Sequence, residues 1–316
     1  MNVVHDIDEL PGGLRFVLAI GTFDGVHRGH RRVVGGLTRA ARELDATPVV
    51  LTFDPHPAAV ISGTPPAALC DLAERVARLA RLGVDTVVVQ YFDNEFADQA
   101  PRDFLERVGR GRQLVGVVMT PESAFGRDRS GGLNAVRHLA DELGYRVIEV
   151  RQLASDGAAL SSTRLRELLA QGRLAEVNRL LGRPYAVIGT VVKGDQRGRQ
   201  LGYPTANLHF DRPVALPPDG IYAVHASWGG DDPLTPAQLR DGVASLGVRP
   251  TFSDGGARVL EVYLFDFDGD LYGQRLRTEF VRRLRGEKRF SSADALIDQM
   301  KRDAGRARQL LSSRRR

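Results

Sequence analysis

The chain has 316 residues, of which 42% are hydrophobic and 26% are charged, so sizeable cores can form and the length favours two domains. No apolar run reaches the roughly 20 residues that span a membrane, and no secretory signal is recognisable, so we expect a cytoplasmic protein without membrane association. The single cysteine, Cys70, excludes an internal disulfide and cysteine-rich zinc sites, and the spread-out net charge of +5 favours phosphate ligands over nucleic acid.

Up to about residue 183, short apolar runs alternate with longer helical patterns. We predict strands at 16–20, 48–53, 86–90, 114–119 and 146–150, and helices at 31–44, 71–82, 101–111 and 133–143. This alternation is typical of an α/β fold, a parallel sheet with helices on both faces. Ligands of such sheets bind at the carboxyl ends of the strands, so the loops that follow the strands are the candidate sites.

The loop after the first predicted strand carries the most informative motif. It reads Gly-Thr-Phe-Asp-Gly-Val-His-Arg-Gly-His over residues 21–30 and leads into a helix. Backbone N–H groups of a glycine-rich turn and the dipole of the following helix form a ready site for phosphate. His27 and His30 are expected on one side of the first helical turn, where they could hold a triphosphate during attack on its α-phosphorus.

Two further segments of the first half point to the same edge of the sheet. His56 follows the second predicted strand in an Asp-Pro-His-Pro run, next to the glycine-rich loop in the predicted sheet. Ser161, Ser162 and Thr163 open another helix, where hydroxyls can cap the first turn. Taken alone, this last segment is explained by capping.

After residue 183 the rhythm changes to β-rich runs separated by glycine, proline and aspartate. We predict strands at 185–192, 220–228, 242–248, 258–267 and 275–280, and a helix at 291–311. The spacings indicate a small antiparallel barrel or sandwich with a C-terminal helix packed across it. The predicted domains are therefore 1–183 and 184–316.

The second half has a glycine-rich loop of its own at 192–202. Gly194 and Gly202 allow close approach of the backbone to phosphate, although an ordinary long hairpin loop would also explain them. Thr205 and Asn207 alternate along the extended segment that follows, so their oxygens are expected on one face, as a shared cation requires.

Together these motifs resemble, in order and over nearly the whole chain, those of the bifunctional riboflavin kinase/FMN adenylyltransferase family, the prokaryotic FAD synthetases. The run at 21–30 and the Ser-Ser-Thr-x-x-Arg run at 161–166 resemble a nucleotidyltransferase signature, and 193–207 resembles the riboflavin kinase module. The resemblance implies a Rossmann-like nucleotidyltransferase domain and a six-stranded kinase barrel. It also implies two reactions: ATP phosphorylates riboflavin to FMN, and AMP is then transferred from ATP to FMN with release of pyrophosphate.

The resemblance further implies roles for individual residues. Glu261 is the candidate general base of the kinase, and Arg166 would neutralise charge on the departing pyrophosphate. Thr205 and Asn207 would reach Mg²⁺ and ATP. The implied nucleotide-binding residues are Gly21, Phe23, Asp24, Gly25, Gly29, His56, Ser161, Ser162, Thr163, Gly194, Arg199 and Gly202, and the implied flavin-binding residues are Phe125, Arg285 and Phe290.

One segment departs from the family pattern. Residues 119–126 read Met-Thr-Pro-Glu-Ser-Ala-Phe-Gly, so Thr120, Glu122 and Ser123 replace the usual glycine, Asn/Asp and phenylalanine near the flavin and adenine pockets. Ser245 stands where the family usually has asparagine. Three readings stay open: a tolerated variant loop, a choice of another nucleotide or a modified flavin, and a loss of transfer.

A fourth reading, from another class, is an RNA-binding barrel. It requires exposed aromatic residues interleaved with basic ones on neighbouring strands. Tyr222, Trp228 and Tyr263 are too scattered to form such a platform, so we expect no nucleic-acid partner.

Overall fold

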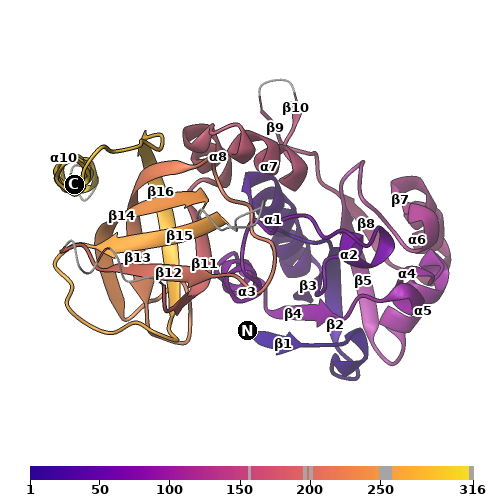
Figure 1. Ribbon diagram of the computed structural model, residues 1–316. Helices are drawn as coiled ribbons and strands as arrows, with labels where there is room; N and C mark the ends of the chain where they lie inside the picture. Colours follow the sequence, from indigo (N-terminus) through magenta and orange to yellow (C-terminus); the bar gives the residue numbers. More distant parts are fainter. Residues whose placement is uncertain (156–157, 195–197, 199–201, 249–257, 313–316) are drawn as a thin grey trace. The chain divides into compact units, whose positions relative to one another are not determined.

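The computed structural model describes residues 1–155, 158–194, 198, 202–248 and 258–312 (Figure 1). The chain divides into two compact units, one made of Met1–Pro66 and Leu72–Ser162, the other of Ala67–Asp71 and Thr163–Arg316. In the described part of the chain, no helix has both the length and the apolar character needed to cross a membrane.

The first unit is built on a six-stranded parallel sheet, as the alternating pattern predicts. Its strands are β1 (Asn2–Val4), β2 (Arg15–Ile20), β3 (Thr47–Phe53), β4 (Thr86–Gln90), β5 (Gln113–Met119) and β8 (Arg146–Glu149), in the order β1-β4-β3-β2-β5-β8. All five predicted strands are present. The edge strand β1 was not predicted, because its three half-exposed or exposed residues form no apolar run.

Helices cover both faces of this sheet (Figure 1). The helices α1 (Arg28–Glu43) and α3 (Leu72–Arg81) bury Val34, Leu37 and Leu79 on one face. The helices α5 (Pro101–Gly109) and α6 (Leu133–Leu143) bury Phe104, Leu105 and Val136 on the other. The shorter elements are η1 (Ile7–Glu9), α2 (Pro57–Ile61), α4 (Asn94–Ala97), β6 (Ala124–Phe125), η2 (Arg127–Arg129), β7 (Gly131–Gly132), β9 (Ala154–Ser155) and β10 (Ala158–Ala159).

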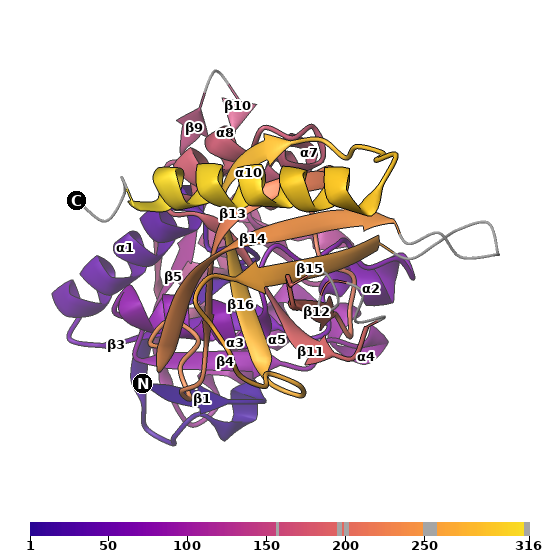
Figure 2. The ribbon, with the colours of Figure 1, turned by 60° about the vertical axis from the view of Figure 1, so that its left-hand side comes forward.

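The second unit contains a closed six-stranded antiparallel barrel, which decides between the predicted barrel and sandwich. Its order is β11-β12-β15-β14-β13-β16, from β11 (Tyr185–Val192), β12 (Thr205–His209), β13 (Gly220–Trp228), β14 (Gln238–Val248), β15 (Arg258–Leu264) and β16 (Arg275–Arg285). Fully buried Tyr185, Tyr222 and Phe280 are among its core residues. The helix α10 (Ala293–Ser312) packs on β13, β14 and β16 through Ala307 and Leu311 (Figure 2).

Two helices belong to the same compact unit as the barrel, although the sequence pattern placed them in the first half of the chain. They are α7 (Ser162–Ala170), of which all but Ser162 falls in the second unit, and α8 (Leu174–Leu181). Asn178 joins α8 to the barrel strands β11 and β16. Its side-chain oxygen accepts from Tyr185 N at 2.7 Å, and its amide nitrogen donates to Phe280 O at 3.1 Å. Packing therefore divides the chain at 162/163, and the domain boundary at 183/184 stays a prediction.

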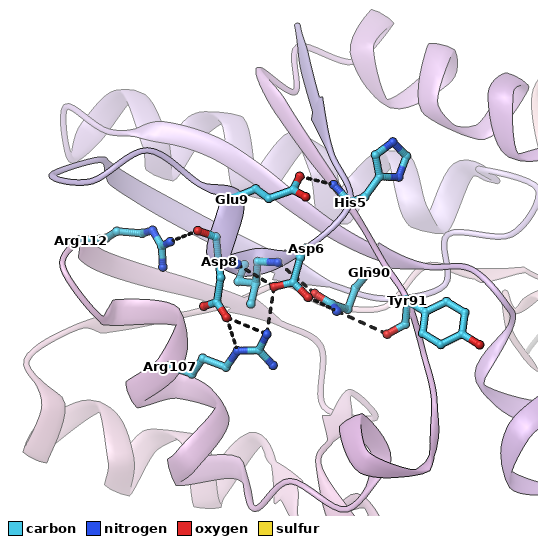
Figure 3. Close-up of polar contacts among 9 residues, drawn as sticks. His5, Asp6, Asp8, Glu9, Gln90, Tyr91, Arg107 and Arg112 are labelled. Carbon is cyan, nitrogen blue, oxygen red and sulfur yellow. Dashed lines mark hydrogen bonds and ion pairs between the residues drawn. The ribbon is translucent and has the colours of Figure 1, made fainter.

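Within the first unit, a polar network connects the segment after β1 to β4 and α5 (Figure 3). Asp6 accepts hydrogen bonds from Asp8 N at 2.8 Å, from Gln90 Nε2 at 2.9 Å and from Arg107 Nη2 at 2.9 Å. Gln90 in turn accepts from the backbone N of buried Ile7 at 3.0 Å. Burial alone would raise the pKa of Asp6, but the hydrogen bonds from Asp8 and Gln90 and the charge of Arg107 outweigh it and lower that pKa below its usual 3.8.

We predict that this network makes the first unit sensitive to acid. A lowered pKa means that ionised Asp6 contributes stability that is fully present above pH 3.8 and is lost as the pH falls through the folded-state value. Asp6→Asn should lower the free energy of unfolding at neutral pH by only about 0.5–1 kcal/mol, because solvent screens the partly exposed Asp6. It should also make the free energy of unfolding depend less on pH in the acid range.

Urea unfolding between pH 3 and pH 7 measures both effects. Asp141→Asn is the control, because Asp141 is exposed on α6 and takes no part in the network around Asp6. An acid slope that is the same in Asp6→Asn and in the parent protein would contradict the prediction.

Candidate functional site

The connection from β2 to α1 is strained, and its side chains hold it in place. Phe23 (φ 47°), Gly25 (φ 79°) and Val26 (φ 39°) all have left-handed backbone conformations. For residues other than glycine this conformation is unfavourable and persists only where the surroundings fix it. Here Phe23 and Val26 are each 2% exposed, and Val26 N donates to Phe23 O at 3.0 Å. Burial of two apolar side chains therefore offsets the strain of the loop.

The two motif histidines lie together at the first turn of α1, as predicted. His27 is the N-cap, and its Nδ1 accepts from His30 N at 3.2 Å, so the neutral ring carries its proton on Nε2. The two rings stack with centroids 3.6 Å apart. A Cβ on Gly29 would come within 2.9 Å of His27 Cε1, so glycine is required between them. The result is a pair of imidazoles at a helix N-terminus, where anions are favoured.

Hydroxyl groups from neighbouring segments support the loop. Ser162 Oγ donates to Asp24 O at 2.9 Å, and Thr52 Oγ1 donates to Thr22 O at 3.0 Å. Behind Thr52, the guanidinium of buried Arg75 donates to Thr52 Oγ1 at 3.3 Å and to Phe53 O at 3.1 Å. Arg75 was not predicted, because within an amphipathic helical pattern an arginine reads as a solvent-exposed residue.

The remaining predicted residues of this site lie in different places. His56 caps α2, with its Nδ1 accepting from Ala58 N at 3.1 Å, and follows β3 as predicted. Phe125 lies on β6 and its ring contacts that of Phe104 at 5.4 Å. Thr163 and Arg166 fall in the second unit, where Arg166 Nε donates to Ala67 O at 2.6 Å. The structure therefore groups His27, His30 and Ser162 within the first unit and describes Thr163 and Arg166 with the second.

The second unit has a pocket of about 360 Å³ beside β12. Thr205, Asn207 and Gly194 line it together with Phe267 to Tyr272, the turn after β15. A Cβ on Gly194 would come within 2.6 Å of the Asn207 amide, so the glycine backbone lies directly against that side chain. Lys193, which was not among the predicted residues, has its Nζ 5.9 Å from the centroid of the Tyr272 ring and adds a cation near the pocket.

The barrel register brings the predicted base next to these residues. Glu261 on β15 is directly opposite Asn207 on β12 and Ser245 on β14. Directly opposite residues of an antiparallel pair point to the same face, so the three side chains form a row. Glu261 does not line the pocket itself. Gly202 is exposed with φ 80°, and Arg199 lies outside the described residues.

The predicted flavin-side residues of the second unit lie at the end of β16 and in the connection to α10. Arg285 is paired with Asp303 of α10, with Nη2 and Oδ2 2.7 Å apart and only 14% and 9% of the two side chains exposed. The Phe290 ring centroid lies 5.9 Å from the Arg285 guanidinium. The geometry gives Arg285 an anchoring contact to the C-terminal helix, and a flavin contact for Arg285 and Phe290 stays a prediction.

Comparisons with known proteins match both units. The FAD synthetase family model matches residues 14–164 and the riboflavin kinase model matches residues 181–311. A protein of Escherichia coli K12 named bifunctional riboflavin kinase/FMN adenylyltransferase is 35% identical over 308 residues, 97% of this chain and 96% of that protein. One of the same name from Pseudomonas fluorescens is 36% identical over 314 residues, with 98% of both chains covered.

A solved structure also matches almost the full length. The crystal structure of a macrolide-efflux protein from Streptococcus pneumoniae aligns with a TM-score of 0.82 at 30% identity, covering 95% of this chain and 96% of that one. The structural similarity therefore extends over both units.

We predict that the Arg285–Asp303 pair holds α10 on the barrel. Asp303→Asn leaves the guanidinium largely buried without its counter-charge, and should lower the free energy of unfolding by about 2–3 kcal/mol. Asp298→Asn is the matched control, because Asp298 pairs with Lys301 on the exposed side of the same helix at 3.8 Å, with over 60% of both side chains exposed. Chemical unfolding of both variants measures the difference, and equal stabilities would rule out the anchoring role.

Proposed function

Because the chain belongs to the bifunctional riboflavin kinase/FMN adenylyltransferase family, we propose that its two activities divide between its two units. The protein phosphorylates riboflavin with ATP and transfers AMP from ATP to FMN. In the proposal, transfer takes place at the β2–α1 loop of the first unit, and phosphorylation takes place at the barrel. The stacked pair of His27 and His30 at the N-terminus of α1 is the observation that carries this assignment.

In the proposed transfer, an oxygen of the FMN phosphate attacks the α-phosphorus of ATP. A new P–O–P bond forms, the bond between the α- and β-phosphates breaks, and pyrophosphate leaves with the electron pair. The attacking phosphate is already ionised, so the reaction needs positioning and charge stabilisation rather than a general base. In this proposal the rings of His27 and His30 and the first N–H groups of α1 supply donors and partial positive charge. The role that the resemblance implies for Arg166, neutralising the leaving pyrophosphate, stays a prediction, because Arg166 is described with the second unit.

In the proposed kinase reaction, Glu261 takes the proton of the ribityl 5′-hydroxyl while the oxygen of that hydroxyl attacks the γ-phosphorus of ATP. ADP leaves with the electrons of the broken bond. The position of Glu261, opposite Asn207 on the neighbouring strand, supports a base within reach of a nucleotide held by Thr205, Asn207 and the backbone at Gly194.

The pocket residues fit a magnesium ion. Thr205 and Asn207 line the pocket together with Asp268 and Asp270, so residues with hydroxyl, amide and carboxylate oxygens surround one space. Mg²⁺ prefers oxygen ligands and is usually held by one or two protein groups together with substrate phosphates. Thr205 and Asn207 would hold it, and bound Mg²⁺ would supply positive charge to the transferring phosphoryl group.

The substrates that follow from this proposal are riboflavin, FMN and ATP. The names of the relatives support AMP as the transferred group, so the proposal sets aside another nucleotide, a modified flavin, a loss of transfer and the RNA-binding reading. A cytoplasmic location, expected from the single free cysteine, stays a prediction.

We predict that Glu261→Gln removes the kinase activity alone. Loss of a general base typically lowers a rate by about 10²–10⁴-fold, and the replacement preserves the shape of the side chain. FMN formation from riboflavin should fall by that amount, while FAD formation from supplied FMN stays at the parent rate. Asp231→Asn, at an exposed position between β13 and β14, is the control and should keep both activities. Near-normal FMN formation by Glu261→Gln would remove this residue from the mechanism.

A second prediction concerns the glycine between the histidines. Gly29→Ala should slow AMP transfer roughly 10²-fold by displacing His27, without touching the kinase. Gly35→Ala in the same helix is the matched control, since a Cβ there meets nothing within 4 Å and the change should stabilise the helix by about 0.5–1 kcal/mol. The measurement is the rate of FAD formation from supplied FMN and, separately, the rate of FMN formation from riboflavin, for both variants and the parent protein. Equal transfer rates for both variants would contradict the placement of the site.

A further inference from the structure

The loop that departs from the family pattern is closed by its own substituted residues. Thr120 Oγ1 and Ser123 Oγ are 2.9 Å apart, and Ser123 Oγ also accepts from Thr120 N at 3.0 Å. Ser123 N donates back to Thr120 O at 3.0 Å. Glycine at 120 and phenylalanine at 123 carry no hydroxyl and could form neither side-chain bond. The substitutions at 120 and 123 therefore support each other.

The third substituted residue, Glu122, joins this loop to two other segments. The Gln152 amide nitrogen, in the orientation that its surroundings require, lies 2.7 and 2.5 Å from the two carboxylate oxygens of Glu122. The backbone oxygen of Glu122 accepts from Arg129 Nη2 at 3.3 Å. Glu122 thus connects the segment after β8 with the short hairpin β6–β7.

That hairpin has a strained backbone that needs outside support. Asp128 (φ 53°) and Arg129 (φ 56°) both have left-handed conformations, and neither is glycine. Such residues persist where neighbouring contacts fix them, and they concentrate at functional sites. The hydrogen bond from Arg129 to the backbone oxygen of Glu122 is one of these contacts. It can form only while Glu122 keeps its position.

The loop and Gln152 leave the sheet at the same edge as the β2–α1 loop. Val118 of β5 is paired with Ala19 of β2, and Met119 with Glu149 of β8. Past β8, Leu153 O accepts from Leu160 N at 2.9 Å, and Leu160 O lies 3.5 Å from the position of a Cβ on Gly29. The segment that carries Gln152 is therefore linked through Leu160 to the turn that holds His27.

We propose that Gln152 is a positioning residue for AMP transfer, which acts through Glu122 on the loop and on Arg129. In this proposal Glu122 is occupied by an amide of the protein and does not select the base or the flavin. A bound ligand at this edge would exclude water from the exposed pair and strengthen it. The proposal rests on the assignment of AMP transfer to the first unit.

An exchange of the two side chains tests the proposal. Gln152→Glu places a second carboxylate against Glu122 and should raise the KM for FMN or ATP in the transfer reaction roughly tenfold, the lower range for a hydrogen bond to a charged group. The double variant Glu122→Gln/Gln152→Glu restores an amide–carboxylate pair with the roles exchanged, and should return KM to within about twofold of the parent value. Riboflavin phosphorylation by the same proteins should stay constant, because the barrel of the second unit is unchanged, and circular dichroism of the variants checks that the first unit is folded.

Glu149→Gln is the matched control, because Glu149 ends β8 three residues before Gln152 and its carboxylate pairs with Arg137 of α6 at 2.5 Å rather than with Glu122. It should leave transfer unchanged. No effect of Gln152→Glu would overturn the proposal. So would failure of the double variant to recover, because a Glu122 that bound ligand directly could not be replaced by glutamine with the charge moved to 152.

Hydrogen exchange of the backbone over 120–132 gives a second readout that needs no activity. Gln152→Glu should increase exchange in this segment, and the double variant should restore the protection. If the parent protein phosphorylates riboflavin but makes no FAD, the proposed function fails, and the exchange measurement still decides the role of the pair. Unchanged exchange in Gln152→Glu would overturn the positioning role in either case.

Discussion

The contact of the His27 ring with the backbone of Gly29 is the constraint on which the site of the first unit depends. With the ring in this place, Nδ1 accepts from His30 N, and the two imidazoles stack over the first turn of α1. The turn that precedes it contains Phe23 and Val26 in left-handed conformations. Burial of those two side chains in the core keeps the strained turn in place. One packing contact thus links core, turn and site.

The proposed phosphate sites of the two units use different physical means. In the first, the positive end of a helix and two imidazoles would supply donors and partial charge directly. In the barrel, the polar residues that line the pocket are neutral Thr205, Asn207 and Tyr272 and the acidic Asp268 and Asp270. These groups cannot neutralise a triphosphate, and the carboxylates repel it. A divalent cation held by Thr205 and Asn207 would supply the positive charge that these lining residues lack, which is why magnesium belongs to the proposal for the barrel.

Features of the site that depend on residues close together in the sequence could be predicted, and contacts between residues far apart in the sequence could not. His27 and His30 are three residues apart, so helical geometry alone places them on one side of the turn. The register that sets Asn207 beside Glu261 joins strands more than fifty residues apart, and only the resemblance to a family suggested it. The Arg285–Asp303 and Glu122–Gln152 contacts left no signal, because single polar residues in amphipathic or loop segments read as solvated.

The altered loop shows why a departure from a family pattern is interpreted through its contacts. Considered one at a time, Thr120, Glu122 and Ser123 add bulk, add charge and remove an aromatic surface. In the structure the two hydroxyls bond each other, and the carboxylate bonds Gln152. A single reversal at 120 or 123 would remove one partner of a hydrogen-bonded pair and leave the other polar group in place, which costs more than removing both. Positions 120 and 123 are therefore expected to be exchanged together, with 122 coupled to 152. Coupling of this kind alters how the loop is held while leaving the residues proposed to bind phosphate, at the end of neighbouring β2, unchanged.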